Sequence, residues 1–291
     1  MTGFSVEVRD LSVHFGDTRA VDHASVELAP GGITGLLGRN GSGKTTLLSI
    51  LASLRRPTGG TVLVDGEDPF ENERVMERVC LVRESGDVLA DEKICATLDV
   101  VAAARPTWDA EYAGELLDLF GLDPKKRPGT LSRGQRSAVG AVIGLASRAP
   151  LTIFDEVYLG MDAPSRYRFY DALLADYVEN PRTIILSSHL ISEVERLFEN
   201  VLVLDHGRVL LAEDADSLRS RGATVVGPAA RVDTAVDGLQ VLGRRDLGPT
   251  AEVTVLGDLT EPVRARLADD GFEVGPVSMQ DLFVHLTSGA S

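Results

Sequence analysis

The pattern of hydrophobic and polar positions changes along this chain of 291 residues. Positions alternate at Phe4–Arg9 and again at Ala24–Leu28, and this alternation predicts two half-buried strands. Short, almost wholly apolar runs at Ile33–Leu37, Leu151–Phe154 and Thr183–Leu186 predict buried strands. The chain therefore supplies both kinds of strand before any chemistry is considered.

Helical periodicity dominates the region between about Val88 and Pro128, where Ala110–Phe120 is the clearest helix. Ser137–Ala146 is small and apolar enough to predict a buried helix. Beyond Arg221, glycine and proline interrupt short apolar segments such as Ala251–Leu256. We therefore expect a large domain at residues 1–221 and a small β-rich appendage at residues 222–291.

Glycines lie at the turn between the predicted strand Ile33–Leu37 and a helix that opens at Thr46. The residues from Gly38 to Thr45 fit the phosphate-binding pattern G-x-x-x-x-G-K-[ST]. Backbone N–H groups of such a loop close around phosphate oxygens, and the helix dipole directs positive charge at them. Lys44 would reach the β- and γ-phosphates, and the Thr45 hydroxyl would bind Mg²⁺. A tight turn with a solvated lysine is the alternative, which is disfavoured because the chain has only four lysines.

Four further motifs follow this loop in order. Leu131–Gln135 reads Leu-Ser-Arg-Gly-Gln and resembles the LSGGQ signature, with arginine in third position. Leu151–Glu156 is an apolar strand that ends in two carboxylates, as Walker B motifs do, and Gly160–Asp162 is similar to a D-loop. Ser187–His189 closes an apolar strand as an H-loop does. On these motifs, roughly residues 4–220 resemble the ATP-binding subunits of ATP-binding cassette (ABC) transporters.

The resemblance implies an α/β fold: a P-loop NTPase domain with a mixed sheet core, an antiparallel β subdomain and a helical subdomain, followed by the small β-rich appendage. It also implies ATP hydrolysis between two such domains packed head to tail, with ATP and Mg²⁺ in each shared site. Asp155 would hold Mg²⁺, Glu156 would polarise the attacking water, and His189 would hydrogen-bond the γ-phosphate.

The resemblance assigns the remaining site residues by position. Phe15 would stack on adenine, although it could instead be an ordinary core residue at a strand end. The implied nucleotide contacts are Phe15, Gly38, Arg39, Asn40, Gly41, Ser42, Gly43, Lys44, Thr45, Thr46, Ser132, Gly134, Gln135 and Asp162. The implied catalytic residues are Glu156, His189 and Lys44, and the implied Mg²⁺ ligands are Thr45, Asp155 and Glu84.

Glu84 departs from the family pattern, which has a glutamine after the strand that follows the P-loop helix. No glutamine precedes Gln135 in this chain, so no shift of the alignment restores it. A glutamate can still ligate Mg²⁺, but it adds negative charge near three phosphates and, when ionised, donates no hydrogen bond. The adjacent Arg83 either offsets this charge or is solvated, and the sequence leaves both open. We expect slower or differently coupled turnover.

Composition limits the remaining classes of protein. Hydrophobic residues make up 44% and charged residues 25%, as in globular proteins. No apolar run approaches the roughly 20 residues of a membrane-spanning helix, and Met1–Ser5 lacks the form of a signal peptide. Cys80 and Cys95 match no metal spacing and suit a reducing cytoplasm as small buried hydrophobes. The net charge of −15 argues against broad binding to nucleic acid, which we do not expect as a partner.

The final stretch, Pro276–Thr287, resembles the end of ATPase subunits from drug- and antibiotic-type ABC exporters. A single cassette without a transmembrane segment implies a separate transmembrane permease, docked near Glu84–Glu92, and a second ATPase protomer, either an identical chain or a close paralogue. The protein would then lie in the cytoplasm, on the inner face of the cell membrane.

Two alternative functions remain open. A nucleotide-binding regulatory subunit with weak hydrolysis is compatible with Glu84 and Arg133. A soluble ABC ATPase that acts on ribosomes or nucleic acid is disfavoured, because the sequence shows no second cassette, long coiled coil or zinc-binding cysteines.

Overall fold

The computed structural model of the protein describes residues 3–84, 88, 91–257 and 259–288. The chain divides into two compact units. Unit 1 comprises Met1–His189 and Arg196–Leu211, and unit 2 comprises Leu190–Glu195 and Ala212–Ser291. The boundary expected after residue 221 corresponds to the end of a helix that belongs to unit 2.

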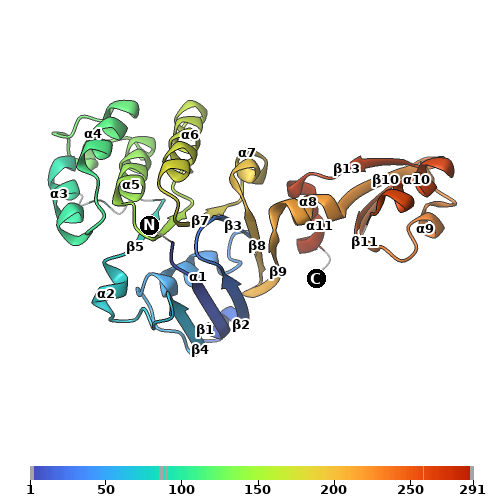
Figure 1. Ribbon diagram of the computed structural model, residues 1–291, viewed down its shortest axis with the longest axis horizontal. Coiled ribbons are helices and arrows are strands. Elements are labelled where there is room, and N and C mark those ends of the chain that lie inside the picture. Colours follow the sequence, from blue (N-terminus) through green and yellow to red (C-terminus); the bar gives the residue numbers. More distant parts are fainter. Residues whose placement is uncertain (1–2, 85–87, 89–90, 258, 289–291) are drawn as a thin grey trace. The chain divides into compact units, whose positions relative to one another are not determined.

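Unit 1 is built on a six-stranded sheet (Figure 1). Its strands, in spatial order, are β5 (Val79–Arg83), β6 (Leu151–Asp155), β7 (Thr183–Ser188), β3 (Ile33–Leu37), β8 (Asn200–Asp205) and β9 (Arg208–Asp214). The first five are parallel, and β9 follows β8 through a turn at His206–Gly207. Every residue of β3, β6 and β7 is buried, as their apolar runs predict.

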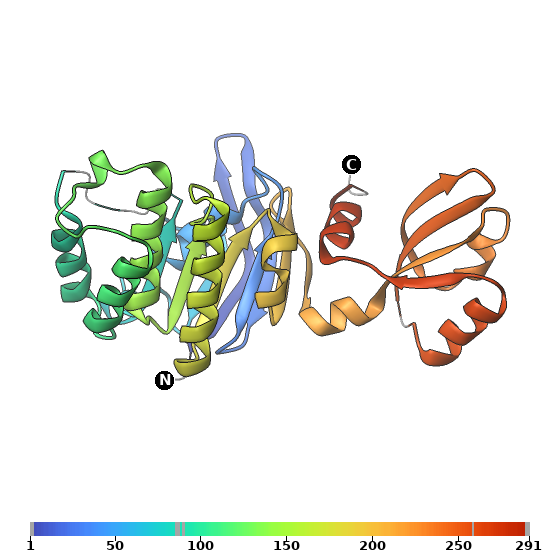
Figure 2. The ribbon, with the colours of Figure 1, turned by 90° about the horizontal axis from the view of Figure 1, so that it is seen from above.

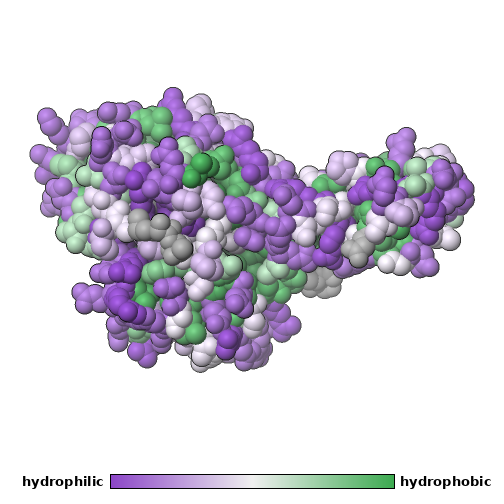
Figure 3. Space-filling view, viewed as in Figure 1, coloured by the Kyte–Doolittle hydropathy of each residue, from purple (hydrophilic) through white to green (hydrophobic). Residues whose placement is uncertain are grey.

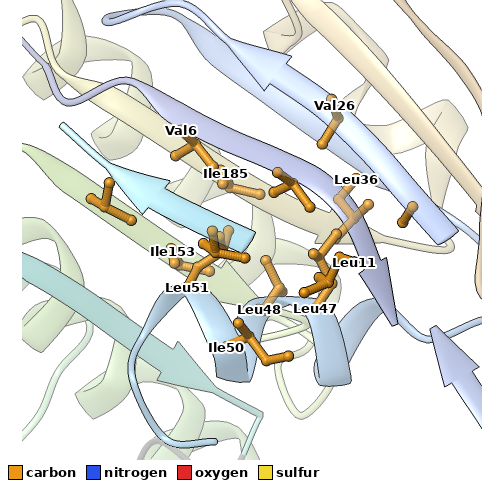
Figure 4. Close-up of a cluster of buried hydrophobic side chains, with 14 of the residues drawn as sticks. Val6, Leu11, Val26, Leu36, Leu47, Leu48, Ile50, Leu51, Ile153 and Ile185 are labelled. Carbon is orange, nitrogen blue, oxygen red and sulfur yellow. The ribbon is translucent and has the colours of Figure 1, made fainter. Parts of the chain in front are cut away.

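A second, antiparallel sheet has the order β2-β1-β4 and comprises β1 (Val6–Phe15), β2 (Thr18–Leu28) and β4 (Gly59–Val64). Helix α1 (Lys44–Leu51) contributes four apolar side chains to a core that contains residues of both sheets. Figure 4 shows Leu47 of α1 beside Leu11 of β1, and Leu51 of α1 beside Ile153 of β6. Burial against two sheets therefore fixes α1 and the loop that precedes it.

Besides α1, unit 1 contains helices that follow β4 in the chain, most of them clustered at the β5 side of the parallel sheet (Figure 1). They are α2 (Glu73–Met76), α3 (Ile94–Ala104), α4 (Ala110–Leu119), α5 (Arg133–Ser147) and α6 (Ala163–Glu179), with a short 3₁₀ turn at Pro128–Thr130. Helix α5 contacts α3, α4, α6, β5 and β6, and every residue from Ser137 to Ser147 is buried. Figure 2 shows α5 and α6 side by side. The expectation of a buried helix after the signature is confirmed.

A buried network of charged side chains joins these helices to the sheet. Arg182 is 2% exposed, and its guanidinium lies 2.7 Å from a carboxylate oxygen of Asp176 on α6. Arg148 lies between this carboxylate, at 3.1 Å, and that of Asp109, at 2.6 Å. Asp109 also caps α4 by accepting the backbone N–H of Tyr112. Burial, followed by the charge of Asp176, raises the pKa of the Tyr112 phenol.

Unit 2 contains a four-stranded antiparallel sheet with its own apolar core. The strands, in the order β11-β12-β10-β13, are β10 (Gly222–Pro228), β11 (Gln240–Leu247), β12 (Thr250–Leu256) and β13 (Glu273–Pro276). The helices are α7 (Ile191–Val194), α8 (Ala215–Arg221), α9 (Val232–Ala235), α10 (Glu261–Asp269) and α11 (Met279–Ser288), and a 3₁₀ turn covers Glu195–Leu197 at the boundary with unit 1.

The expected fold class is confirmed: an α/β cassette with parallel and antiparallel sheets and a cluster of helices. Among the described residues, no helix is both long enough and apolar enough to cross a membrane. Cys80 is buried and Cys95 is half-buried. On the face drawn in Figure 3, hydrophilic side chains predominate on each unit and the hydrophobic ones form small separate groups.

The buried network generates a stability prediction. Asp176→Ala removes a carboxylate that faces two guanidinium groups, so we expect the free energy of unfolding of unit 1 to fall by about 3–5 kcal/mol. Urea unfolding followed by the fluorescence of Trp108, the single tryptophan, measures this. Asp171→Ala is the control, because its 3.5 Å ion pair with Arg196 is exposed to solvent. Equal midpoint shifts for both variants would contradict the assigned role of burial.

Candidate active site

The carboxyl ends of four adjacent strands bring the candidate residues to one edge of the parallel sheet. In the register of the sheet, Arg83 pairs with Asp155, Asp155 with Ser187, and Ser188 with Leu37. Glu84, Glu156, His189 and Gly38, which follow these strand ends, therefore emerge beside one another. Ligand sites of open α/β sheets lie at this edge.

The loop from Gly38 to Thr45 has the shape that a phosphate cradle needs. Helix α1 begins at Lys44, and the preceding Gly43 has a φ of 103°, a conformation that favours glycine. A Cβ atom on Gly38 would lie 2.3 Å from Ser42 Oγ and 2.6 Å from the Leu204 carbonyl oxygen. A larger residue at position 38 would therefore have to displace the loop.

Two buried polar side chains inside this loop fit a phosphate. Ser42 is 3% exposed, and its Oγ atom has no hydrogen-bond partner among the described residues. The Nζ atom of Lys44, 5% exposed, donates to the carbonyl oxygens of Gly38 at 2.7 Å and Arg39 at 3.2 Å. Burial lowers the pKa of Lys44, while the charges of Glu156 and Asp155 oppose this effect. The Ser42 hydroxyl and the Lys44 ammonium group therefore lie at the start of α1, and the N-terminus of a helix favours anions.

Ser187 organises the two carboxylates at the end of β6. Its Oγ atom donates to Asp155 Oδ1 at 2.6 Å and accepts the backbone N–H of Glu156 at 3.0 Å. The backbone of Glu156 is held at a φ of 52°, which is uncommon for a non-glycine residue. The two neighbouring residues therefore have different environments: Asp155 is buried, and Glu156 is half-buried.

Glu156 lies among the other charged groups of the site. Its Oε1 atom is 3.7 Å from Lys44 Nζ and 3.2 Å from His189 Nδ1. The structure therefore brings together the three residues expected to be catalytic. Oxygen donors for a hard cation are also present nearby, in Asp155 and in Thr45 at the first turn of α1.

The donor set fits Mg²⁺ bound partly by phosphate oxygens. No group of three or more His, Cys, Asp or Glu side chains among the described residues forms a cage for a metal ion. Mg²⁺ usually binds through one or two carboxylates together with substrate phosphates, and Thr45 with Asp155 matches that pattern.

The signature residues lie at the start of α5, and their described contacts include one another and the D-loop. Ser132 caps α5, and its side chain and that of Gln135 form a reciprocal capping box. A Cβ atom on Gly134 would lie 2.7 Å from the Gly160 carbonyl oxygen. Asp162 caps α6 by accepting the Ser165 N–H, and hydrogen bonds from Ser165 lower the pKa of Asp162. The first turn of α5, which carries the signature, therefore packs closely against the D-loop.

Phe15 lies at the end of β1 with 44% of its surface exposed, which suits a stacking role better than a core role. The Arg55 guanidinium lies 4.3 Å from the centroid of the Phe15 ring. A nucleotide base would therefore stack on the face that Arg55 leaves open, or would displace Arg55.

Sequence reasoning assigned no individual role to Ser187 or to Tyr158. The Tyr158 hydroxyl lies in the core and donates to Ser188 Oγ at 2.7 Å, so it ties the segment after β6 to the end of β7. The position of Ser187, a hydroxyl residue two places before the H-loop histidine, was a usable signal for it. Tyr158 carries no such signal, because its partner is thirty residues away in sequence.

Glu84 forms an ion pair with Arg133 of the signature, so Arg133 supplies a charge that offsets this glutamate. The sequence had left that role open for Arg83. Of the expected docking segment Glu84–Glu92, residues 85–87, 89 and 90 lie outside the described part of the chain.

Comparisons with known proteins agree with this geometry. The family model for ABC transporters matches residues 21–158. The chain is 31% identical over 309 residues to the daunorubicin/doxorubicin resistance ATP-binding protein DrrA of Streptomyces peucetius, covering 97% of this chain and 92% of that protein. It is 32% identical over 216 residues to the methionine import ATP-binding protein MetN of Mesorhizobium japonicum, covering 70% and 59%. A dimeric ATP-binding cassette in a post-hydrolysis state with ADP and Pi has a TM-score of 0.63 at 20% identity, covering 72% and 98%, and at this identity it shows the fold alone.

Lys44 provides a test of the phosphate cradle. Lys44→Ala removes a charged donor at the loop, so we expect the affinity for a fluorescent ATP analogue to fall roughly tenfold or more. Lys125→Ala, at an exposed position far from the loop in sequence, is the control and should bind normally. Unchanged affinity for Lys44→Ala would show that the loop is not a nucleotide site.

Proposed function

This chain belongs to the ABC transporter family as one of its ATP-hydrolysing subunits, and from that premise we propose that it drives export of a drug- or antibiotic-like compound through a separate membrane permease. The permease would hold the protein at the inner face of the cell membrane. The transported compound would contact the permease, while this chain supplies the free energy of ATP hydrolysis.

The observation that carries the export proposal is the extent of similarity along the chain. The match to the drug resistance protein DrrA of Streptomyces peucetius covers 97% of the chain and therefore reaches into unit 2, whereas the matches to other drug-type relatives and to the methionine import protein cover 70–74%. Importers and exporters share the cassette, so the cassette does not distinguish them. Unit 2 contains Pro276–Thr287, whose sequence resembles the end of exporter ATPases.

Binding of ATP would begin at the loop 38–45. The β- and γ-phosphate oxygens would accept hydrogen bonds from backbone N–H groups of the loop, from Ser42 Oγ and from Lys44 Nζ. Thr45 and Asp155 would hold Mg²⁺, which when bound neutralises charge on these phosphates. Phe15 would stack on the base.

Glu156 is suited to act as the general base. In hydrolysis, a water oxygen bonds to the γ-phosphorus while the bond to the β–γ bridging oxygen breaks, and the bridging oxygen leaves on ADP with the bonding electrons. Glu156 would orient this water and take its proton. Its carboxylate lies 3.7 Å from Lys44 Nζ, which would bind the γ-phosphate, so the carboxylate would lie close to the attacked phosphorus. His189, 3.2 Å from the same carboxylate, would orient Glu156 and contact the γ-phosphate.

A complete site would require a second protomer. Ser132, Gly134 and Gln135 lie on the turn packed against the D-loop, so a head-to-tail partner would present its own turn to the γ-phosphate. The second protomer would be an identical chain or a close paralogue. ATP bound between the protomers would then hold the dimer together.

This chain has a groove along β5, the edge strand of the parallel sheet, that would suit docking of the permease. Leu81, Val88 and Leu54 contribute apolar surface to this groove, and Leu54 is 60% exposed. Arg83 and Arg105 contribute positive charge. We infer that a cytoplasmic helix of the permease, apolar on one face and acidic at its rim, docks here beside Glu84.

The role of Glu156 as base predicts a separation of binding from turnover. Glu156→Gln should abolish ATP hydrolysis and leave ATP binding intact, because the amide keeps the shape of the side chain but cannot accept the proton. Size-exclusion chromatography with ATP should then show a trapped dimer. Glu179→Gln, exposed at the end of α6, is the matched control. Near-normal hydrolysis by Glu156→Gln would exclude Glu156 as the base, and an inactive wild-type chain would favour the regulatory alternative.

The export proposal predicts lower drug accumulation in cells. Cells that express this chain with its permease should retain less doxorubicin, measured by its fluorescence, than cells that express Lys44→Ala with the same permease. The Lys44→Ala strain controls for the permease itself. Equal accumulation in the two strains would contradict ATP-driven export of this class of compound.

A further inference from the structure

Arg133 and Glu84 are both departures from the family motifs, and the structure joins them. Glu84 stands where the family has glutamine, and Arg133 is the unusual third residue of the signature. Their side chains form an ion pair within one chain. Each residue alone would alter the charge of its motif by one unit, whereas the pair is neutral.

A second contact fixes the same two segments together. Ser137 Oγ donates to the backbone carbonyl oxygen of Glu84 at 3.2 Å. Ser137 lies one helical turn after Arg133, on the same face of α5. The first turn of α5 therefore holds both the backbone and the side chain of Glu84.

The D-loop packs on this same turn. A Cβ atom on Gly160 would lie 2.5 Å from Ser137 Oγ and 2.9 Å from Arg133 Cγ. Glycine at 160 thus allows the D-loop to approach the two residues that hold Glu84. Three motifs meet at Arg133: the segment after β5, the signature and the D-loop.

The pair connects elements that would serve different nucleotide sites. Glu84 follows β5, whose last residue, Arg83, is in register with Asp155 at the Mg²⁺ side of the chain's own site. Arg133 lies between Ser132 and Gly134, which a head-to-tail dimer would present to the partner's nucleotide. A displacement of Glu84 would therefore be transmitted to the signature turn of the same protomer.

The free energy of folding does not account for this pair. The Arg133 side chain is 64% exposed and that of Glu84 is 37% exposed, and exposed ion pairs add little to stability. Near a bound triphosphate, by contrast, an unpaired glutamate would repel three phosphates. The effect of the pair therefore concerns nucleotide binding and the local contact between the two segments, not the stability of the whole unit.

We propose that Arg133 is a positioning residue, which neutralises Glu84 and links the Mg²⁺ side of one nucleotide site to the signature turn that completes the other. This proposal rests on the proposed ATPase function and its head-to-tail dimer. The link would make the occupancy of one site affect the second, a coupling between sites that appears as cooperativity in ATP concentration.

The test compares Glu84→Gln, Arg133→Gln and the double variant with the wild-type chain. Arg56→Gln is the matched control, because Arg56 forms an exposed ion pair with Glu71 elsewhere in unit 1. Three quantities are measured: affinity for Mg²⁺-ATP, the Hill coefficient of ATP hydrolysis, and backbone hydrogen exchange at residues 79–84 and 133–137 without nucleotide.

We expect Arg133→Gln to weaken Mg²⁺-ATP binding about fivefold or more, because Glu84 is then uncompensated. The double variant should regain wild-type affinity, because the excess charge is gone, while its Hill coefficient stays closer to one because the link is absent. Hydrogen exchange at both segments should be faster in each variant that lacks the pair, and Arg56→Gln should match the wild type in all three measurements.

Wild-type affinity and wild-type exchange in Arg133→Gln would overturn the proposal, as would effects of the two single substitutions that simply add in the double variant. The hydrogen-exchange measurement is made without nucleotide. It therefore tests whether the Arg133–Glu84 contact holds the two segments together even if the chain proves to hydrolyse no ATP. Failure of the link and failure of the ATPase function are thus distinguishable.

Discussion

The burial of α1 against two sheets is the constraint on which the site depends. Its apolar side chains belong to a core shared with the antiparallel and the parallel strands, so the helix has little freedom to shift. The loop 38–45 ends on this helix and begins on β3, which is buried along its whole length. Both ends of the proposed phosphate-binding loop are therefore anchored in the core.

The register of the parallel sheet brings the carboxylates and the histidine of the site to the loop 38–45. Because β5, β6, β7 and β3 are neighbours and point the same way, their last residues share one edge. Ser187 then sets the directions of the two consecutive carboxylates through two hydrogen bonds. The chemistry that the motifs imply thus depends on a topology in which residues far apart in sequence meet.

The sequence predicted the local parts of this arrangement well. Apolar runs predicted β3 and β6 within a residue, and the motifs that carry the family resemblance singled out Lys44, Glu156 and His189, which the structure brings together. Contacts between segments that are distant in sequence, such as the pairing of Glu84 with Arg133, could not be predicted from the sequence. Arg83 was a candidate for offsetting the charge of Glu84 because the two residues are adjacent in sequence, whereas Arg133 is brought to Glu84 only by the fold. The bond between Tyr158 and Ser188 was also unpredictable, because neither the residue type nor the spacing indicates it.

The left-handed backbone of Glu156 has a consequence for how this protein could change over time. A non-glycine residue in that conformation destabilises the fold by about 1–3 kcal/mol, and here the strained residue is the one proposed to accept a proton. Selection for stability alone would favour glycine or asparagine at this position, while selection for turnover opposes the change. The identity of residue 156 in any descendant of this chain is therefore a record of whether hydrolysis was still required of it.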